Sequence, residues 1–329
     1  MTTSQSRNNT ISALLLAALL AACGGGSDSN STGSNSSDSS NTATDNPTAI
    51  TLQQEAGAPT SSGDTALDGF NWTNFRRKQA GIPELTRNSL VDVAARGHSE
   101  YQRLNNTITH VQTAGRPGFT GATLLDRLNA VGYTFGTSSY AYGEVIAAAS
   151  DSSGFYLAEE LVAAIYHRFV MFEPIFKESG TGATTIAGGY TYFTNNFTTN
   201  NGFGPGLGSG QLALYPYAGQ SRVPTVFFSD QEEPDPVPNQ NEVGYPISVH
   251  ANFTSRLTVD RFTVRPRGGA AMVVRLLSAA TDVQTSQSGP AAAAIIPLAV
   301  LNSGTVYDVS FRGQIDGMQV DKDWSFTTQ

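Results

Sequence analysis

The sequence predicts an α+β domain followed by an all-β domain of the immunoglobulin-like sandwich type. In residues 64–231, apolar side chains recur at helical spacings of three and four between short runs rich in Thr, Tyr and Phe. In residues 247–329, apolar and polar residues alternate with the period of a half-buried strand. The four prolines of residues 232–246 remove backbone donors and favour extended chain, which places a Pro-rich linker between the two domains.

Helices and short strands are both expected in residues 64–231. The helical patterns run from Leu67 to a stop at Gly81 and over residues 89–105, 123–131 and 155–170. The β-like runs are residues 144–148, 185–193 and 211–217, and the Gly-rich residues 201–210 indicate a loop before the last of them. This mixture is typical of an α+β domain.

About seven short strands separated by turns are expected in residues 247–329. Their alternating apolar residues are Ile247 and Val249, Leu257 and Val259, Phe262 and Val264, Met272 to Leu277, Tyr307 to Phe311, and Trp324 and Phe326. Strands of this length and pattern indicate two facing sheets, as in an immunoglobulin-like sandwich.

The first 23 residues have the features of an export signal that ends at the only cysteine of the chain. The apolar run Ile11–Ala22 is too short to cross a bilayer core, which needs roughly 20 apolar residues. It ends in LAAC, which resembles the bacterial lipobox, where the cysteine thiol receives a diacylglycerol. The sequence therefore predicts a membrane anchor through lipid on Cys23. An ordinary signal peptide, with Cys23 removed or incidental, is the alternative.

Residues 24–63 are expected to be a disordered Gly/Ser tether, because they offer too little apolar surface to offset chain entropy. Such a coil reaches roughly 35 Å. Gly24 stands in place of the Asp that often retains lipoproteins in an inner membrane, so the outer membrane is the expected location in a Gram-negative cell. The net charge of −8, with three lysines, argues against nucleic acid as a partner.

Candidate chemistry depends on few residues, because the chain has four histidines. His98, on an apolar helix face, is interpreted as a hydrogen-bonded packing residue. His110 follows the same helix, and His167 follows Glu160 by seven residues, a spacing that returns to one helix face. With Glu144, which precedes a strand-like run, these residues could serve a divalent cation such as Zn²⁺, or acid–base chemistry near neutral pH.

Several motifs, in this order, resemble the CAP superfamily, which includes cysteine-rich secretory proteins, plant pathogenesis-related proteins and bacterial SCP-like extracellular proteins. The motifs are NFRRKQAGIPEL, LVDVAARGHSEY, THVQ, DRLNAVGY, YGEVIA, YHRFVMFEP and FKESGTG, within about residues 67–182. The bacterial pattern has A-x-x-H on a helix, a later His, dR-x-x-x-x-GY, a GENIA-like strand, an HR pair and a GVG-like strand. The order of the pieces carries the resemblance, because no single piece is specific.

The resemblance implies an α-β-α sandwich with a surface cleft lined by two His and two Glu. His110 matches the first histidine, Glu144 the Glu of the GENIA-like strand, and His167 the second histidine. Glu160 is the candidate for the second Glu, with Glu159 as its alternative. The aromatic landmark that precedes this Glu in the family is absent, and the stretch before His167 is shortened.

Three functions are compatible with these residues. The leading hypothesis is a lipid-anchored CAP protein that binds an extracellular lipid, glycan, peptide or protein in the cleft. The rival is a metal-dependent hydrolase or peptidase, with Zn²⁺ or another divalent cation on His110 and His167 and with Glu144 as general base. The third is a structural envelope protein, in which the same residues form a polar network that holds the cleft walls together.

Other polar features have simpler interpretations. Ser209 lies in a Gly-rich loop without a Gly-x-Ser-x-Gly elbow, so serine-hydrolase chemistry is not indicated. The same loop lacks the Lys-Ser/Thr of a phosphate loop. Glu173 and Glu178 are expected on the surface or in turns, and the Glu232-Glu233 pair is expected in a solvated linker.

Overall fold

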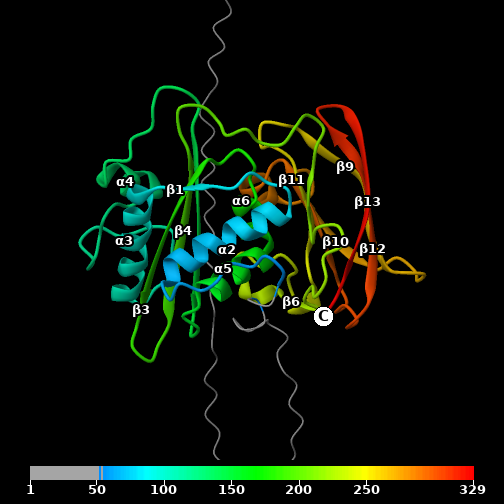
Figure 1. Ribbon diagram of the computed structural model, residues 1–329, viewed down its shortest axis with the longest axis horizontal. Coiled ribbons are helices and arrows are strands. Elements are labelled where there is room, and N and C mark those ends of the chain that lie inside the picture. The colour runs from blue at the N-terminus through cyan, green and yellow to red at the C-terminus, as the bar shows by residue number, and fades with distance from the viewer. Residues whose placement is uncertain (1–51, 53–54) are drawn as a thin grey trace, which may run out of the picture.

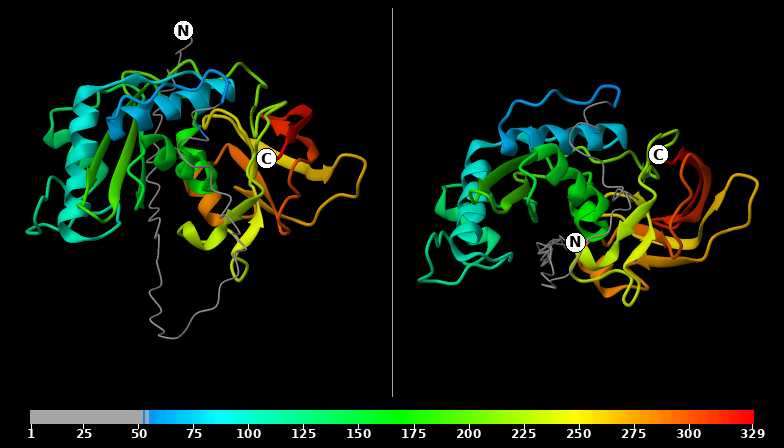
Figure 2. Two further views of the ribbon diagram at one scale, coloured as in Figure 1. Left: turned by 60° about the horizontal axis from the view of Figure 1, so that its bottom comes forward. Right: turned by 90° about the horizontal axis from the view of Figure 1, so that it is seen from below.

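The computed structural model describes Leu52 and residues 55–329, which fold in layers (Figure 1). From left to right, Figure 1 shows a helical layer, a β-sheet, a second helical layer and the sheets of the C-terminal residues, and Figure 2 shows them from two other directions. The predicted mixture of helices and sheets is therefore confirmed. Cys23 and most of the expected tether lie outside the described residues. The end of the tether that is described is not disordered, because Leu52 is buried and Glu55 forms an ion pair with Arg76. Within the described part, no helix is long and apolar enough to cross a membrane.

Residues 65–199, which we call the helical part, contain one sheet with helices on both faces. The strand order is β1-β3-β4-β2, and every pair except the parallel β1–β3 is antiparallel. Helices α3 and α4 cover one face, whereas α2, α5 and α6 cover the other. The elements are α2 (Thr65–Gln79), β1 (Thr86–Arg87), α3 (Ser89–Asn105), α4 (Leu124–Ala130), β2 (Ala141–Ala149), α5 (Gly154–Ala163), α6 (Ile165–Met171), β3 (Glu178–Thr185) and β4 (Thr191–Thr199).

Two glycines in β3 let α3 lie directly on the sheet. A Cβ at Gly180 would lie 2.2 Å from the backbone nitrogen of Asp92, and a Cβ at Gly182 would lie 2.2 Å from that of Arg96. Any larger residue at either position would push α3 away from β3. Because α3 also carries His98, this close approach determines where that histidine lies.

The helix expected over residues 155–170 is in fact two helices, α5 and α6, that meet at Ala164. The backbone of Ala164 is extended, with φ −67° and ψ 118°, so it ends α5 and precedes the first turn of α6. The prediction that Glu160 and His167 share one helix face is therefore wrong, since the two residues lie on different helices.

The strand expected over residues 185–193 is also wrong, because this segment contains a turn. β3 ends at Thr185 and β4 begins at Thr191. Gly188, with a φ of +69°, provides the left-handed conformation that the turn requires. Thr and Tyr residues on both sides of the turn produce the appearance of one continuous strand.

Residues 213–327, which we call the β part, form two larger sheets and a short hairpin. The sheets have the orders β10-β11-β8-β5 and β13-β12-β9, and β6 pairs with β7. The elements are β5 (Ala213–Tyr215), β6 (Val226–Phe228), a 3₁₀ turn (Ser229–Gln231), β7 (Glu242–Gly244), β8 (Ile247–His250), β9 (Leu257–Pro266), β10 (Val274–Ser278), α7 (Val283–Ser288), β11 (Ala292–Pro297), β12 (Val306–Ile315) and β13 (Met318–Thr327).

The strand pattern of the β part agrees with the alternating apolar residues in most places. β8, β10, β12 and β13 lie where strands are expected, whereas Leu257 and Phe262 belong to one strand, β9. β11 has no alternating pattern, because all six of its residues are buried. An immunoglobulin-like arrangement of these sheets stays a prediction.

Residues 232–246 do not form a solvated linker. Glu232 is 1% exposed, and Val237, Val243 and Tyr245 are also buried. β7 lies inside this range and pairs with β6, while β5, which precedes the range, pairs with β8, which follows it. This segment is packed against the hydrophobic core through Val237, Val243 and Tyr245, while residues 238–242 between them are exposed.

A continuous hydrophobic core joins the helical part to the β part. Phe172, directly after α6, packs edge-on against Tyr215 of β5, with ring centroids 5.2 Å apart, and Phe169 of α6 packs against His250 at 5.8 Å. These side chains are buried together with residues from β8, β11 and β12. Helix α6 is therefore held between the sheet of the helical part and the β part.

Candidate functional site

A buried polar cluster surrounds Glu144 of β2. The Arg127 guanidinium, from α4, donates from Nη2 to both carboxylate oxygens, at 2.8 and 2.7 Å. His110, between α3 and α4, lies with Nδ1 2.9 Å from Oε1 of Glu144. All three residues are buried. The structure therefore brings His110 and Glu144 together and adds Arg127, which motif comparison alone did not identify as part of the site.

The charge of Arg127 determines the protonation of this cluster. Burial by itself would raise the pKa of Glu144, but Arg127, His98 and the hydrogen bond from His110 hold that pKa well below its usual range. An ionised carboxylate only accepts, so Nδ1 of His110 donates to Glu144 and Nε2 is the nitrogen directed away from it. That Nε2 atom is buried and has no hydrogen-bond partner among the described residues.

His98 packs beside this cluster with both ring nitrogens occupied. Nε2 donates to the Thr109 carbonyl at 2.7 Å, and Nδ1 accepts from the Gln112 amide at 3.0 Å. Burial lowers the pKa of His98 to about 4, although the neighbouring Glu144 opposes this effect. His98 is therefore a neutral packing residue at pH 7, as its place on an apolar helix face predicts.

His167 lies in a second buried cluster, at the start of α6, and its partner is Glu232. Nδ1 of His167 is 3.1 Å from Oε1 of Glu232. The same carboxylate accepts from the backbone N–H groups of Ile165 and Tyr166 at 2.8 and 2.7 Å. Since the residue before α6 makes no side-chain cap, Glu232 supplies the acceptors that the first turn of α6 needs.

The residues expected to hold a metal are not assembled into one site. His110 is paired with Glu144, and His167 is paired with Glu232. Among the described residues, no group of three or more His, Cys, Asp or Glu side chains is placed to hold a metal ion. A catalytic Zn²⁺ site typically has three protein ligands. The residues present therefore do not fit the divalent-metal site that the resemblance implies.

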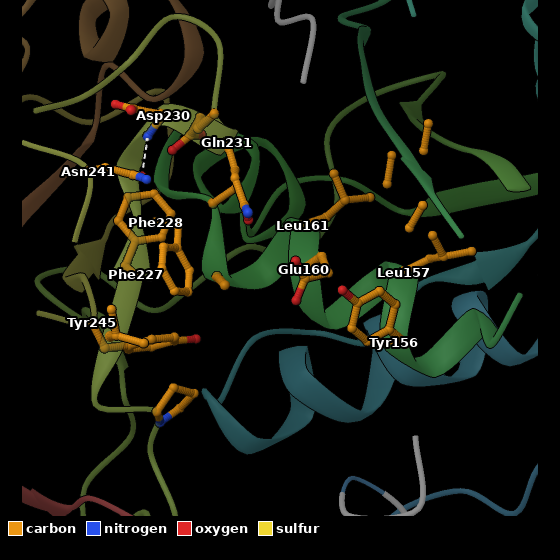
Figure 3. Close-up of a pocket in the computed structure, with 18 of the residues that line it drawn as sticks. Tyr156, Leu157, Glu160, Leu161, Phe227, Phe228, Asp230, Gln231, Asn241 and Tyr245 are labelled. Carbon is orange, nitrogen blue, oxygen red and sulfur yellow. Dashed lines mark hydrogen bonds between the residues drawn. The ribbon is translucent and has the colours of Figure 1, made fainter. Parts of the chain in front are cut away.

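A groove of about 570 Å³ lies beside α5, and of the four predicted cleft residues only Glu160 lines it. Figure 3 shows Glu160 and Tyr156 on the α5 side and Phe227, Phe228 and Tyr245 on the opposite side. This volume is in the range of small-molecule sites, which span roughly 300 to 1,000 Å³. The lining combines aromatic and aliphatic side chains with polar groups such as Glu160, Gln231 and Asn241, a mixture that can hold a small molecule.

Glu159, the alternative to Glu160, belongs to a structural ion pair. It accepts from Arg76 Nε and from the Trp72 indole, both at 2.7 Å. Arg76 is bound in turn by Glu55 at 2.6 Å. Of these two carboxylates of α5, Glu160 is the one that lines the groove.

Two further expectations about acidic residues are wrong. Glu173, expected on the surface or in a turn, is 5% exposed and accepts from the backbone N–H groups of Ile175 and Phe253, both at 3.2 Å. Glu232 is part of the α6 cap and is not solvated. Glu173 accepts from Phe253, 80 residues away, and Glu232 accepts from Ile165, 67 residues away, and no local pattern could reveal these contacts. Glu178, by contrast, is half-buried at the start of β3.

The aromatic side of the groove also escaped sequence reasoning. Phe227 and Phe228 come from β6, and Tyr245 follows β7, within or next to the expected linker. The short run VFF, with β-forming residues just before the Pro-rich segment, was the available signal for a strand here.

No protein-family model and no curated protein matches the chain. Among solved structures, it is similar to an extracellular protein with an SCP domain from Bacillus anthracis, at 23% identity and a TM-score of 0.34, over 45% of this chain and 48% of that one. An outer surface protein from Borrelia burgdorferi matches at 14% identity and a TM-score of 0.34, over 40% of this chain and 90% of that one. A cysteine-rich secretory protein from Staphylococcus aureus matches at 17% identity and a TM-score of 0.29, over 43% and 40%. The aligned region thus covers about half of the Bacillus protein.

Proposed function

We propose that this is an exported, lipid-anchored CAP-type protein that binds an extracellular ligand in the groove between α5 and the β6–β7 hairpin. The observation that carries the proposal is the groove itself, about 570 Å³ in volume and bounded by aromatic side chains on both sides. Sites with apolar walls and a few polar groups typically bind small molecules. The β part, proposed to be an immunoglobulin-like sandwich, contributes one wall of this site.

Binding is favoured over metal-dependent hydrolysis by the state of Glu144. Its carboxylate is held by Arg127 on both oxygens, and its pKa is well below the usual range. A general base works best with a pKa near the operating pH, so this carboxylate is a weak base. His110 and His167 bind different carboxylates, and among the residues that the structure describes neither belongs to a three-ligand group, which also favours binding over hydrolysis.

The proposal is tested with the neutral fluorescent probe N-phenyl-1-naphthylamine, titrated into the full-length protein in detergent-free buffer after delipidation. Ala163 lines the groove and is half-buried, so Ala163→Trp would fill the space with an indole. We expect saturable binding to the wild type and an affinity at least ten-fold lower in the variant.

The matched control is Ala114→Trp, because Ala114 is exposed in a loop far along the chain from the groove residues. It should bind the probe as the wild type does. Circular dichroism and thermal unfolding of both variants confirm that the fold is retained. Absence of saturable binding to the wild type, or equal affinity in Ala163→Trp, would contradict the proposed function.

A further inference from the structure

Strand β2 has an open edge that forms part of the groove. In the sheet order β1-β3-β4-β2, β2 is the last strand, and among the described strands it pairs only with β4. Residues 147–150, at the end of β2, line the groove with the small side chains of three alanines and a serine. An edge strand presents unpaired backbone N–H and C=O groups, and small side chains leave those groups accessible.

The hydrogen bonds of the sheet show which β2 residue points to this edge. The N–H of Asn88 donates to the Ser179 carbonyl at 2.9 Å, so odd-numbered residues of β3 bond toward β1 and even-numbered residues bond toward β4. The registers pair even residues of β3 with even residues of β4, and odd residues of β4 with odd residues of β2. Ala147 and Ala149 therefore bond to β4, whereas the N–H and C=O of Ala148 point to the open edge.

No other described segment occupies this edge. Among the described residues, no backbone hydrogen bond outside the β2–β4 ladder involves Ala148. Ala148 is half-buried and lines the groove, so a ligand in the groove can reach its backbone. An open strand edge of this kind is a template for pairing with another extended chain.

The walls of the groove offer contacts for the side chains of such a chain. Leu157 and Leu161 of α5 lie across the space from Phe227 and Phe228 of β6 (Figure 3). Successive side chains of an extended peptide point to opposite faces, so every second side chain can pack against these walls.

The chemistry of the lining favours a neutral or basic peptide. Its charged side chains, Glu160, Asp230 and Glu232, are all acidic, so acidic side chains on the peptide would be repelled. A lipid acyl chain could fill the apolar space but has no row of N–H and C=O groups to pair with β2. A peptide therefore accounts for both the apolar walls and the open edge.

We propose that the groove binds an extended segment of a partner protein, which adds to β2 as a fifth strand through the N–H and C=O of Ala148. The segment has apolar residues at every second position and no acidic side chains. This inference rests on the proposed function, because it names the class of ligand for the same groove. In strand addition, main-chain hydrogen bonds supply affinity, and the pockets for alternate side chains supply specificity.

The test uses the N-acetylated, C-amidated heptapeptide Lys-Thr-Val-Thr-Val-Thr-Lys as a competitor of N-phenyl-1-naphthylamine on the full-length protein. Two isomers carry the same number of backbone N-methyl groups, either on both valines or on the last two threonines. The N–H groups of alternate residues point to opposite edges of a strand, and only one edge pairs with β2. We expect one isomer to bind at least ten-fold more weakly than the parent peptide and the other to bind within three-fold of it.

On the protein side, Ala148→Pro removes the N–H at the open edge and leaves the bonds of Ala147 and Ala149 to β4 in place. It should weaken the parent peptide at least ten-fold while it still binds the probe. The matched control is Ala114→Pro, because Ala114 is exposed and follows Thr113 in the turn that the Arg116 N–H closes, a position that favours proline. It should bind peptide and probe as the wild type does.

The two isomers decide the inference on the wild type even if Ala148→Pro fails to fold. If the probe binds but the parent peptide does not displace it, or if the two isomers bind equally, the inference is overturned while the proposed function stands. Full peptide affinity in a folded Ala148→Pro overturns it as well. If the probe itself does not bind, the proposed function fails and the inference fails with it.

Discussion

Glu144 and Arg127 show how a buried charge is kept stable at the scale of single residues. Both are almost fully buried, at 3% and 0% exposure, and each would be costly alone. Two hydrogen bonds from one guanidinium, with His110 as the third donor, satisfy both carboxylate oxygens. Glu144 held in this way can connect β2 to α4 and to the loop of His110. This is the role that the sequence analysis describes as a structural polar network.

Replacing Glu144 with Gln should lower the free energy of unfolding by about 3 to 5 kcal/mol at pH 7, because Arg127 would remain buried without a counter-charge. Urea unfolding measures the change. Glu84→Gln, at an exposed ion pair, should change stability by less than about 1 kcal/mol. A loss in Glu144→Gln no larger than in this control would contradict the cluster's role.

Glu144 should also make the free energy of unfolding depend on pH. Because the folded-state pKa of Glu144 is lowered, its contribution is complete above the unfolded value of 4.5 and is lost as the pH falls below it. Wild-type stability should therefore fall more steeply than that of Glu144→Gln between pH 5 and pH 3. Parallel curves for the two proteins would show that Glu144 is not ionised by Arg127 in the folded state.

At the scale of elements, the junction of α5 and α6 decides which residues share a site. Residues 155–170 have helical spacing of apolar residues both before and after Ala164, because both segments are helices. The spacing therefore does not reveal that the helix is interrupted at Ala164. The break is stabilised by Glu232, which lies 67 residues after Ile165. The family resemblance placed His110, Glu144 and His167 in one cleft. It could not show that His167 contacts Glu232, because that contact depends on a long-range cap of α6.

Glu232→Ala should destabilise the protein by about 1 to 3 kcal/mol, because it leaves the N–H groups at the start of α6 and the His167 ring without their acceptor. Glu233→Ala changes the neighbouring, exposed carboxylate and should have little effect. Thermal and urea unfolding of the two variants provide the comparison. Equal effects would mean that the cap contributes nothing to the stability of α6.

In the whole molecule, the helical part and the β part share one hydrophobic core. The α+β character and most strands were predictable, since their patterns are local. The sequence could not show that residues 232–246 are packed rather than a solvated linker, because prolines indicate extended chain whether or not that chain is buried. Burial of Glu173 against Phe253, 80 residues later, is a consequence of this joint core.

The buried carboxyl group of Glu173 should make the stability of the protein depend on pH. Burial raises the pKa of Glu173 to about 8, against hydrogen bonds and Arg77 that lower it. Above the unfolded value of 4.5 the unfolded chain releases a proton that the folded protein retains, so the free energy of unfolding falls as the pH rises toward 8. In Glu173→Gln this loss, on the order of a few kcal/mol, should disappear. Urea unfolding at pH 5, 7 and 9 measures it, and an unchanged pH slope in the variant would contradict the buried, protonated state.

We propose that ligand binding belongs to the groove beside α5 and not to the His110–Glu144 cluster. The most direct measurement is the affinity of N-phenyl-1-naphthylamine for three proteins: the wild type, Ala163→Trp in the groove, and His110→Gln in the cluster. The structure predicts that Ala163→Trp loses at least ten-fold in affinity and that His110→Gln binds as the wild type does. Binding that survives in Ala163→Trp and is lost in His110→Gln would contradict the account and place the site at the histidine cluster.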